Sequence, residues 1–190
     1  MTLVIAQLGA DGAAHMLGDR AVRIAGTYTQ SLSYAKVWQP VPSLVIGCAG
    51  AVNWLEAAQT WTVPAFLPRE YAGLPLLRMV AAALADRAPK GATCQCIIAT
   101  AGTLYPFAVT EDRSVAPFPT ADGCAAIGSG ALPALAALKV LGAMQTPEVR
   151  LFAAARVTAE LMPGDVSPPF DLLTIEANAA STSASGSHGE

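Results

Sequence analysis

The sequence predicts an α+β fold: a four-layer α/β/β/α sandwich in which two antiparallel sheets pack face to face between paired helices. Its apolar segments follow the order strands, two helices, two strands, two helices and a last strand. A doubly wound parallel sheet would require single helices to alternate with strands, and the chain lacks that order. The length of 190 residues fits one domain, predicted over residues 2–177, followed by a polar tail over 178–190.

The first quarter of the chain is predicted to form strands. ADG at 10–12 is a turn signal between two apolar runs, and GTYTQSLSY at 26–34 fits a loop or an edge hairpin. The strands expected here are Thr2–Leu8, Ala13–Leu17, Ala21–Ala25, Ala35–Trp38 and Leu44–Cys48.

Helical periodicity begins in AVNWLEAAQTW at 51–61 and returns after a proline-containing stretch. The expected elements are a helix over Leu74–Arg87, strands over Cys94–Thr100 and Leu104–Val109, a helix after the glycine turn at 128–130, a helix over Pro147–Leu161 and a strand over Phe170–Glu176. The tail, NAASTSASGSHGE, is small, polar and without periodicity, so we expect it to be disordered.

Composition excludes several classes of protein. The net charge is −3 and no basic run is present, which argues against nucleic-acid binding. No apolar stretch is long enough to span a membrane and no leader pattern is visible, so a cytoplasmic protein is expected. Apolar residues make up 53% and charged residues 13% of the chain. That excess fits either a subunit that buries surface in an assembly or simply an alanine-rich composition.

Histidine and cysteine usage narrows the chemistry. The only histidines are His15, in an apolar strand, and His188, in the tail. This scarcity argues against most histidine-dependent hydrolases and most zinc chemistry. Cys94 and Cys96 are separated by one residue, which is not metal-finger spacing, and buried reduced thiols are expected. We therefore expect neither a metal nor a cofactor.

Five short strings, in order, resemble the proteasome β-subunit family. They are TLVIAQ at 2–7, GDRA at 18–21, AKVWQ at 35–39, IGCAG at 46–50 and AIGSG at 126–130. The chain is most similar to small bacterial members, such as the HslV peptidase and the betaproteobacterial proteasome homologue. The resemblance runs from Thr2 to about Glu176 and is carried by the set rather than by any single string.

The resemblance implies the N-terminal-nucleophile hydrolase fold and a self-compartmentalising threonine-type endopeptidase that cleaves proteins or peptides inside a ring. It implies a double-ring homo-oligomer, with a 14-mer favoured over a 12-mer, and by analogy a ring-shaped ATPase partner. Two alternatives stay open: a non-catalytic ring or scaffold subunit of the same fold, and a small-molecule amidase that uses the same threonine.

Thr2 is the nucleophile that the resemblance implies. With no usable histidine, the free α-amine of a terminal threonine can act as base, because its reference pKa is about 7.7–8.0. This chemistry requires that Met1 be removed, since an amide nitrogen is not a base. Methionine removal is common before a residue as small as threonine.

Three further residues match catalytic positions of the family. Lys36 would lower the pKa of the Thr2 hydroxyl, and Asp19 would hold that lysine charged and oriented. Gly47 would supply the backbone N–H that binds the oxyanion. The alternative interpretation makes Asp19 a turn cap, Lys36 a surface lysine and Gly47 part of a strand-to-helix turn.

The remaining candidates are less closely matched. Ser129 would help to hold the terminal amine, or it could only cap a helix. Asp165 and Ser167 lie where the family has a late aspartate and serine, although two prolines replace its usual glycine-rich pattern. Arg23 and Ala49 are expected to bind substrate, and Arg23 departs from the small polar residue that is usual there.

Overall fold

The computed structural model describes residues 2–24, 27–30, 35–60, 73–142 and 145–177. The predicted tail and parts of the predicted loop at 26–34 lie outside these ranges. In the described part of the chain, no helix has the length and apolar character needed to cross a membrane.

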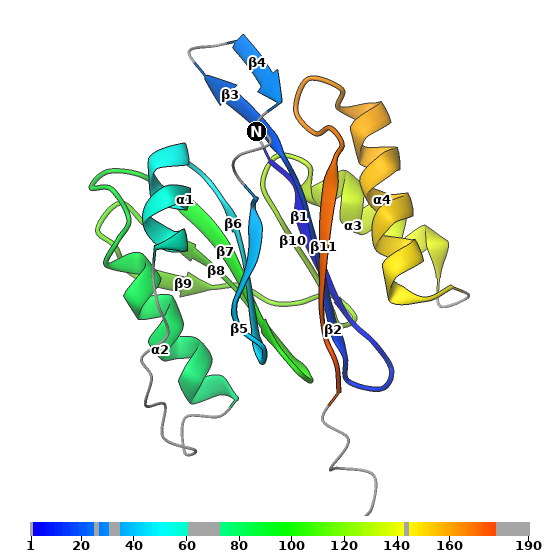
Figure 1. The fold of residues 1–190 in the computed structure, drawn as a ribbon, viewed down its shortest axis with the longest axis horizontal. Helices are drawn as coiled ribbons and strands as arrows, with labels where there is room; N and C mark the ends of the chain where they lie inside the picture. Colours follow the sequence, from blue (N-terminus) through cyan, green and yellow to red (C-terminus); the bar gives the residue numbers. More distant parts are fainter. Residues whose placement is uncertain (1, 25–26, 31–34, 61–72, 143–144, 178–190) are drawn as a thin grey trace, which may run out of the picture.

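Two antiparallel sheets form the centre of the molecule (Figure 1). The first has the order β10-β1-β2-β11 and consists of β1 (Val4–Leu8), β2 (Ala14–Asp19), β10 (Cys124–Ile127) and β11 (Phe170–Ile175). The second has the order β5-β6-β7-β8-β9 and consists of β5 (Val37–Val41), β6 (Leu44–Ala49), β7 (Cys94–Thr100), β8 (Thr103–Val109) and β9 (Val115–Pro117). A separate hairpin pairs β3 (Ala21–Ile24) with β4 (Thr27–Gln30).

Helices cover the outer face of each sheet. Figure 1 shows α1 (Val52–Gln59) and α2 (Leu74–Ala85) on the five-stranded sheet, and α3 (Ala131–Leu141) and α4 (Pro147–Leu161) on the four-stranded sheet. The predicted α/β/β/α sandwich is therefore confirmed.

Three apolar layers hold the sandwich together. Along β1, Val4 and Ala6 pack between the two sheets, whereas Leu3 and Ile5 pack under α3 and α4. Successive side chains of a strand point to opposite faces, so the consecutive apolar residues Leu3–Ala6 are buried on both faces of the sheet. The third layer joins the five-stranded sheet to α1 and α2 and includes Trp54.

The structure adds detail that the sequence pattern did not predict. The strand expected to end at Trp38 extends to Val41, and the residues 26–34, left open between loop and hairpin, contribute β4 to a hairpin. The short strand β9 was not predicted, because three partly exposed residues that end in a proline give almost no periodic signal.

Candidate functional site

Thr2 lies just before β1, one of the two central strands of the four-stranded sheet. Only 5% of Thr2 is exposed. Its backbone N–H donates to Ser129 Oγ at 3.2 Å, and its carbonyl accepts from the Gly130 N–H at 3.3 Å. The Ser129 hydroxyl also lies 3.5 Å from the Thr2 carbonyl oxygen. The turn at 128–130 thus binds both the backbone N–H and the carbonyl of Thr2.

Gly128 allows this turn to approach Thr2. Its φ is +88°, and a Cβ at this position would lie only 2.2 Å from the Thr2 carbonyl oxygen. Any other residue would therefore displace Thr2 or the turn. The Gly128 N–H donates to Gln95 Oε1 at 2.9 Å, so the turn is also tied to β7 of the opposite sheet.

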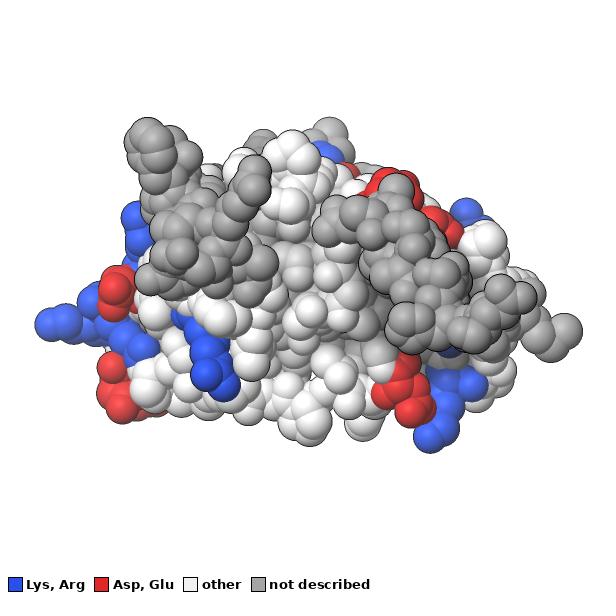
Figure 2. All heavy atoms as spheres, turned by 90° about the horizontal axis from the view of Figure 1, so that it is seen from below, with Lys and Arg blue, Asp and Glu red and all other residues white. Residues whose placement is uncertain are grey.

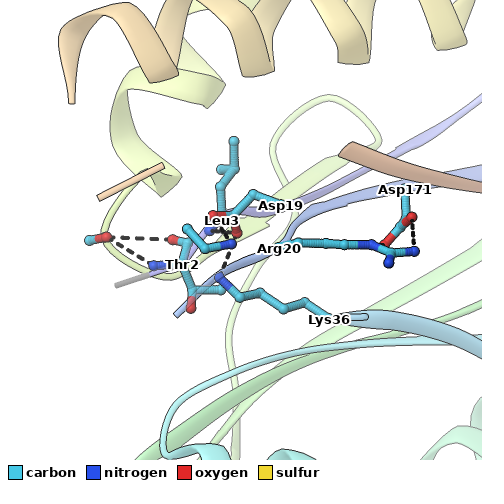
Figure 3. Close-up of polar contacts among 8 residues, drawn as sticks. Thr2, Leu3, Asp19, Arg20, Lys36 and Asp171 are labelled. Atoms are coloured by element: carbon cyan, nitrogen blue, oxygen red, sulfur yellow. Dashed lines mark hydrogen bonds and ion pairs between the residues drawn. The ribbon is translucent and has the colours of Figure 1, made fainter. Parts of the chain in front are cut away.

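A buried ion pair lies beside Thr2. Lys36 Nζ donates to Asp19 Oδ1 at 2.7 Å, and the two residues are 1% and 0% exposed. Asp19 also accepts the Leu3 N–H at 2.8 Å and the Ala21 N–H at 3.2 Å. Figure 3 shows the Lys36 side chain extending towards both Thr2 and Asp19. One carboxylate therefore holds the lysine and the peptide group that follows Thr2.

Burial shifts the pKa of both partners. Burial raises the pKa of the Asp19 carboxyl, against the opposite effects of Lys36 and the Leu3 N–H. Burial likewise lowers the pKa of the Lys36 ammonium, although Asp19 counteracts part of that shift. Lys36 therefore gives up its proton at a lower pH than an exposed lysine does.

Gly47 and Gly50 have different surroundings. Gly47 lies inside β6, opposite Val37 and Ile97, and a Cβ there would be 2.5 Å from Val4 Cγ1. Gly47 thus serves close packing between the sheets. Gly50, with a φ of +150°, follows β6 and lines a pocket together with Thr2.

The pocket beside Thr2 has a volume of about 490 Å³. It is lined by Thr2, by residues 49–51, 93–95 and 108–110, and by Gly128 and Ser129 of the turn. Residues 108–110 are the last two residues of β8 and the residue that follows them. None of the lining side chains carries a formal charge at neutral pH. The predicted substrate-binding residue Ala49 is in this lining, whereas Gly47 is not.

The other sequence candidates come from two further segments of the chain. Asp165 and Ser167 lie between α4 and β11 and do not line the pocket; the Asp165 N–H bonds to the Met162 carbonyl at 2.9 Å. Arg23 belongs to β3, where its backbone pairs with Tyr28, and its side chain lies outside the described part of the structure. The structure therefore brings together Thr2, Asp19, Lys36 and Ser129.

The structure places His15 in a strand and buries the cysteines, as the sequence predicts. His15 in β2 is buried, and its Nδ1 lies 3.1 Å from both Thr174 Oγ1 and Glu148 Oε1. The four cysteines are free and buried. Cys48 and Cys96 face each other across β6 and β7 with their sulfurs 2.7 Å apart.

Sequence reasoning missed Gly50 and Gln95. The signal for Gly50 was its place after an apolar strand and before a helix, where a positive φ is common. Gln95 gave no signal of its own, because its contact with Gly128 spans 33 residues and depends on how the two sheets are placed.

No protein-family model matches the sequence, and no curated protein matches it. Solved structures do match. Eukaryotic HslV from Trypanosoma brucei has a TM-score of 0.67 and 23% identity, over 92% of this chain and 99% of that one. BPH from Thiobacillus denitrificans, in complex with epoxomicin, has a TM-score of 0.65 and 17% identity, over 94% and 100% of the two chains. Anbu, an ancestral beta-subunit, from Yersinia bercovieri has a TM-score of 0.60 and 12% identity, over 91% and 81%.

These likenesses establish the fold. The chain has the N-terminal-nucleophile hydrolase fold of these structures, in which two antiparallel sheets pack between helices on both sides. Its resemblance to the HslV-like and proteasome β-subunit proteins, drawn above from five short strings, is confirmed at the level of the fold.

Proposed function

We propose that the protein is a threonine-type endopeptidase in which Thr2, after removal of Met1, is the nucleophile. The observation that carries this proposal is the placement of Thr2. Its nitrogen bonds to Ser129 Oγ, the buried Lys36–Asp19 pair lies next to it, and it lines a pocket of substrate size. A buried ion pair adds little net stability, and buried titratable pairs are frequent at functional sites, which favours a catalytic use of this pair.

The reaction needs no group beyond the chain and water. The free Thr2 amine takes the proton of the Thr2 hydroxyl, whose oxygen attacks the scissile carbonyl carbon. The C–N bond then breaks as the amine passes its proton to the leaving nitrogen, and an ester remains on Thr2. A water molecule, deprotonated by the same amine, attacks this ester, and the bond to the Thr2 oxygen breaks as the amine returns the proton to that oxygen, which releases the second product.

Gly50 is the better candidate for the oxyanion donor than Gly47. The Cys48 N–H bonds to the Lys36 carbonyl at 2.9 Å, on the side of β6 that faces β5. N–H groups alternate between the two edges of a strand, so the next one on that edge belongs to Gly50. Gly50 also lines the pocket with Thr2. We assign the oxyanion contact to its N–H, in place of the Gly47 contact that the resemblance implied.

Lys36 and Asp19 have electrostatic roles in this proposal. A positive Lys36 beside Thr2 lowers the pKa of the hydroxyl and keeps the neighbouring amine neutral at a lower pH. Asp19 fixes the lysine through the 2.7 Å contact and fixes β1 through the Leu3 N–H. Ser129 keeps the Thr2 nitrogen in place to act as base.

The test combines an intact mass measurement with cleavage of a peptide library. Wild type should lack Met1, cleave peptides and bind one epoxomicin per chain. Thr2→Ala should neither cleave peptides nor bind epoxomicin. Thr120→Ala, which changes an exposed threonine outside the site, is the matched control and should retain activity. Retention of Met1, or cleavage by Thr2→Ala at the wild-type rate, would overturn the proposal.

We also propose that the chain assembles with itself as a double ring, a 14-mer in preference to a 12-mer, in the cytoplasm. Exposed apolar side chains on the outer helices support assembly: Leu132 and Val140 on α3 are 80% and 87% exposed, and Leu161 on α4 is 67% exposed. Proteins or peptides are the proposed substrates, and a ring-shaped ATPase would deliver folded ones.

A non-catalytic subunit of the same fold is the second candidate. It is favoured by Arg23, which departs from the small polar residue that is usual in the family, and by the two prolines that follow Ser167 in place of the usual glycine-rich pattern. Peptide cleavage that disappears in Lys36→Ala would reject this candidate, because a scaffold role does not require the lysine charge.

A further inference from the structure

We propose that Gln95 couples the choice of substrate to the turn that holds Thr2. Its Oε1 orients the turn, and its Nε2 recognises an uncharged, hydrogen-bond-accepting side chain of the substrate in the pocket. The inference rests on the proposed endopeptidase function and adds to it a substrate class and a specificity residue.

The orientation of the Gln95 amide follows from its partner. The Gly128 N–H can only donate, so the atom of Gln95 that faces it at 2.9 Å must be the oxygen. Oxygen and nitrogen lie on opposite branches of the amide, so this contact also fixes the direction of Nε2. Among the described residues, Nε2 has no hydrogen-bond partner, and Gln95 belongs to the pocket lining. Two N–H donors are therefore available to a bound molecule.

The link from Gln95 to the nucleophile is short. Gln95 holds the Gly128 N–H, and Gly128 is packed so closely that a Cβ would be 2.2 Å from the Thr2 carbonyl oxygen. The next residue, Ser129, bonds to the Thr2 nitrogen. A movement of the Gln95 amide is therefore passed through two consecutive residues to the proposed base.

The chemistry of the pocket selects against charged side chains. Its polar lining consists of hydroxyls and the Gln95 amide. Cys94, the sulfur-containing residue of the lining, has its pKa raised by burial to about 11, so its thiol is neutral at physiological pH. A lysine, arginine, aspartate or glutamate entering this pocket would lose water without gaining a counter-charge, which is costly. Amide and hydroxyl side chains, such as those of glutamine, asparagine and threonine, match the free donors.

Two variants distinguish the role of Gln95 Oε1 from that of Gln95 Nε2. Gln95→Glu keeps an oxygen for the Gly128 N–H but replaces the free donors with negative charge. Gln95→Met removes both contacts at similar length. The substrates are peptides in which the two residues flanking the scissile bond are varied one at a time, and kcat and KM are measured separately for each.

At one of the two flanking positions, wild type should cleave peptides with glutamine at least tenfold more efficiently than those with lysine or glutamate. Gln95→Glu should reverse the order of glutamine and lysine at that position, and it should lower kcat less than Gln95→Met does, because an oxygen remains for the Gly128 N–H. Gln95→Met should lower kcat for every peptide and lose the preference for glutamine over leucine. A purely structural role would lower activity without changing preference.

Equal cleavage of charged and uncharged peptides at both positions, or an unchanged preference in Gln95→Glu, would overturn the inference. If wild type cleaves no peptide, the proposed function fails, and the pocket is then assessed by binding alone. Fluorescence anisotropy of the same peptides with Thr2→Ala should still show the preference for uncharged residues, and equal binding of lysine peptides would refute it.

Discussion

Lys36 and Asp19 show how this chain retains charge in its interior. Both are almost wholly removed from water, and burial opposes the charged form of each. A pair of this kind contributes little net stability compared with apolar residues of similar size, whereas loss of one partner leaves an uncompensated buried charge. The pair is therefore better explained by its position beside Thr2 than by stability.

Removal of one partner should destabilise the fold more than removal of both charges. Lys36→Met leaves a buried carboxylate without its cation, and we expect a loss of about 3–5 kcal/mol in the free energy of unfolding. Asp19→Asn combined with Lys36→Met should recover part of that loss, because no charge remains. Urea denaturation at pH 7 measures both. A double variant less stable than Lys36→Met would contradict the expectation.

The lowered pKa of Lys36 predicts a dependence of stability on pH. In the window between its folded pKa and the ordinary value of 10.5, the unfolded chain binds the proton and the folded chain does not. The free energy of unfolding therefore rises with pH through this window and falls as the pH is lowered through the folded pKa.

The matched comparison is Asp19→Asn against Asp19→Asn with Lys36→Met, because the two differ only in Lys36. The lysine-containing variant should gain stability relative to the other as the pH is raised towards 10.5. Denaturation midpoints at several pH values above 7 provide the measurement. A constant difference would show that Lys36 titrates as it does in water.

At the scale of elements, close contact between β1, β2 and β6 depends on glycine. Gly47 lies opposite Val4 and Met16 across the space between the sheets, where a Cβ would be 2.5 and 2.6 Å from their side chains. The pattern of the strands explains the layers. Consecutive apolar residues in a strand point to both faces of the sheet, so both faces of that sheet have to be buried.

Gly47→Ala should overpack this layer and lower the free energy of unfolding by about 1–3 kcal/mol. Gly164→Ala is the control, since a Cβ there meets nothing within 4 Å and its φ is not in the left-handed region. Thermal denaturation of both variants tests the contrast. Equal melting temperatures would show that the two sheets can separate slightly at no cost.

Elements were also easier to predict from the sequence than the site. The periodicity of the long strands and helices is local, so the four layers and most element bounds could be predicted. Asp19 and Lys36 were found through their order along the chain. They are 17 residues apart in the sequence, and only the fold shows that their side chains are in contact. The distinction between Gly47 and Gly50 depends on where β6 ends, and the contact of Gln95 depends on the distance between two sheets.

At the scale of the whole molecule, charge and apolar surface are unevenly distributed. In the view of Figure 2, most of the coloured charged side chains lie towards the two ends, and the lower middle of that face is uncharged. On the outer helices, Leu132, Val140 and Leu161 are largely exposed. A single copy would leave this apolar surface in water, which favours association.

Charges placed on α3 should weaken the proposed assembly. Leu132→Lys with Val140→Asp replaces two highly exposed apolar side chains and disturbs no buried contact, so the folded chain should persist. Sedimentation velocity should show a large particle for wild type and smaller species for the variant. A wild-type protein that sediments as a single chain at micromolar concentration would refute self-assembly.

The position of β1 between β10 and β2 has a consequence for motion. Residues next to the end of a chain usually fray, and their amide hydrogens exchange rapidly with solvent. The Leu3 N–H instead bonds to the carboxylate of Asp19 inside the core, and β1 is paired along both edges. Hydrogen–deuterium exchange should therefore place Leu3 and the residues of β1 among the slowest amides of the protein. The proposed nucleophile would then be held by the part of the molecule that opens last.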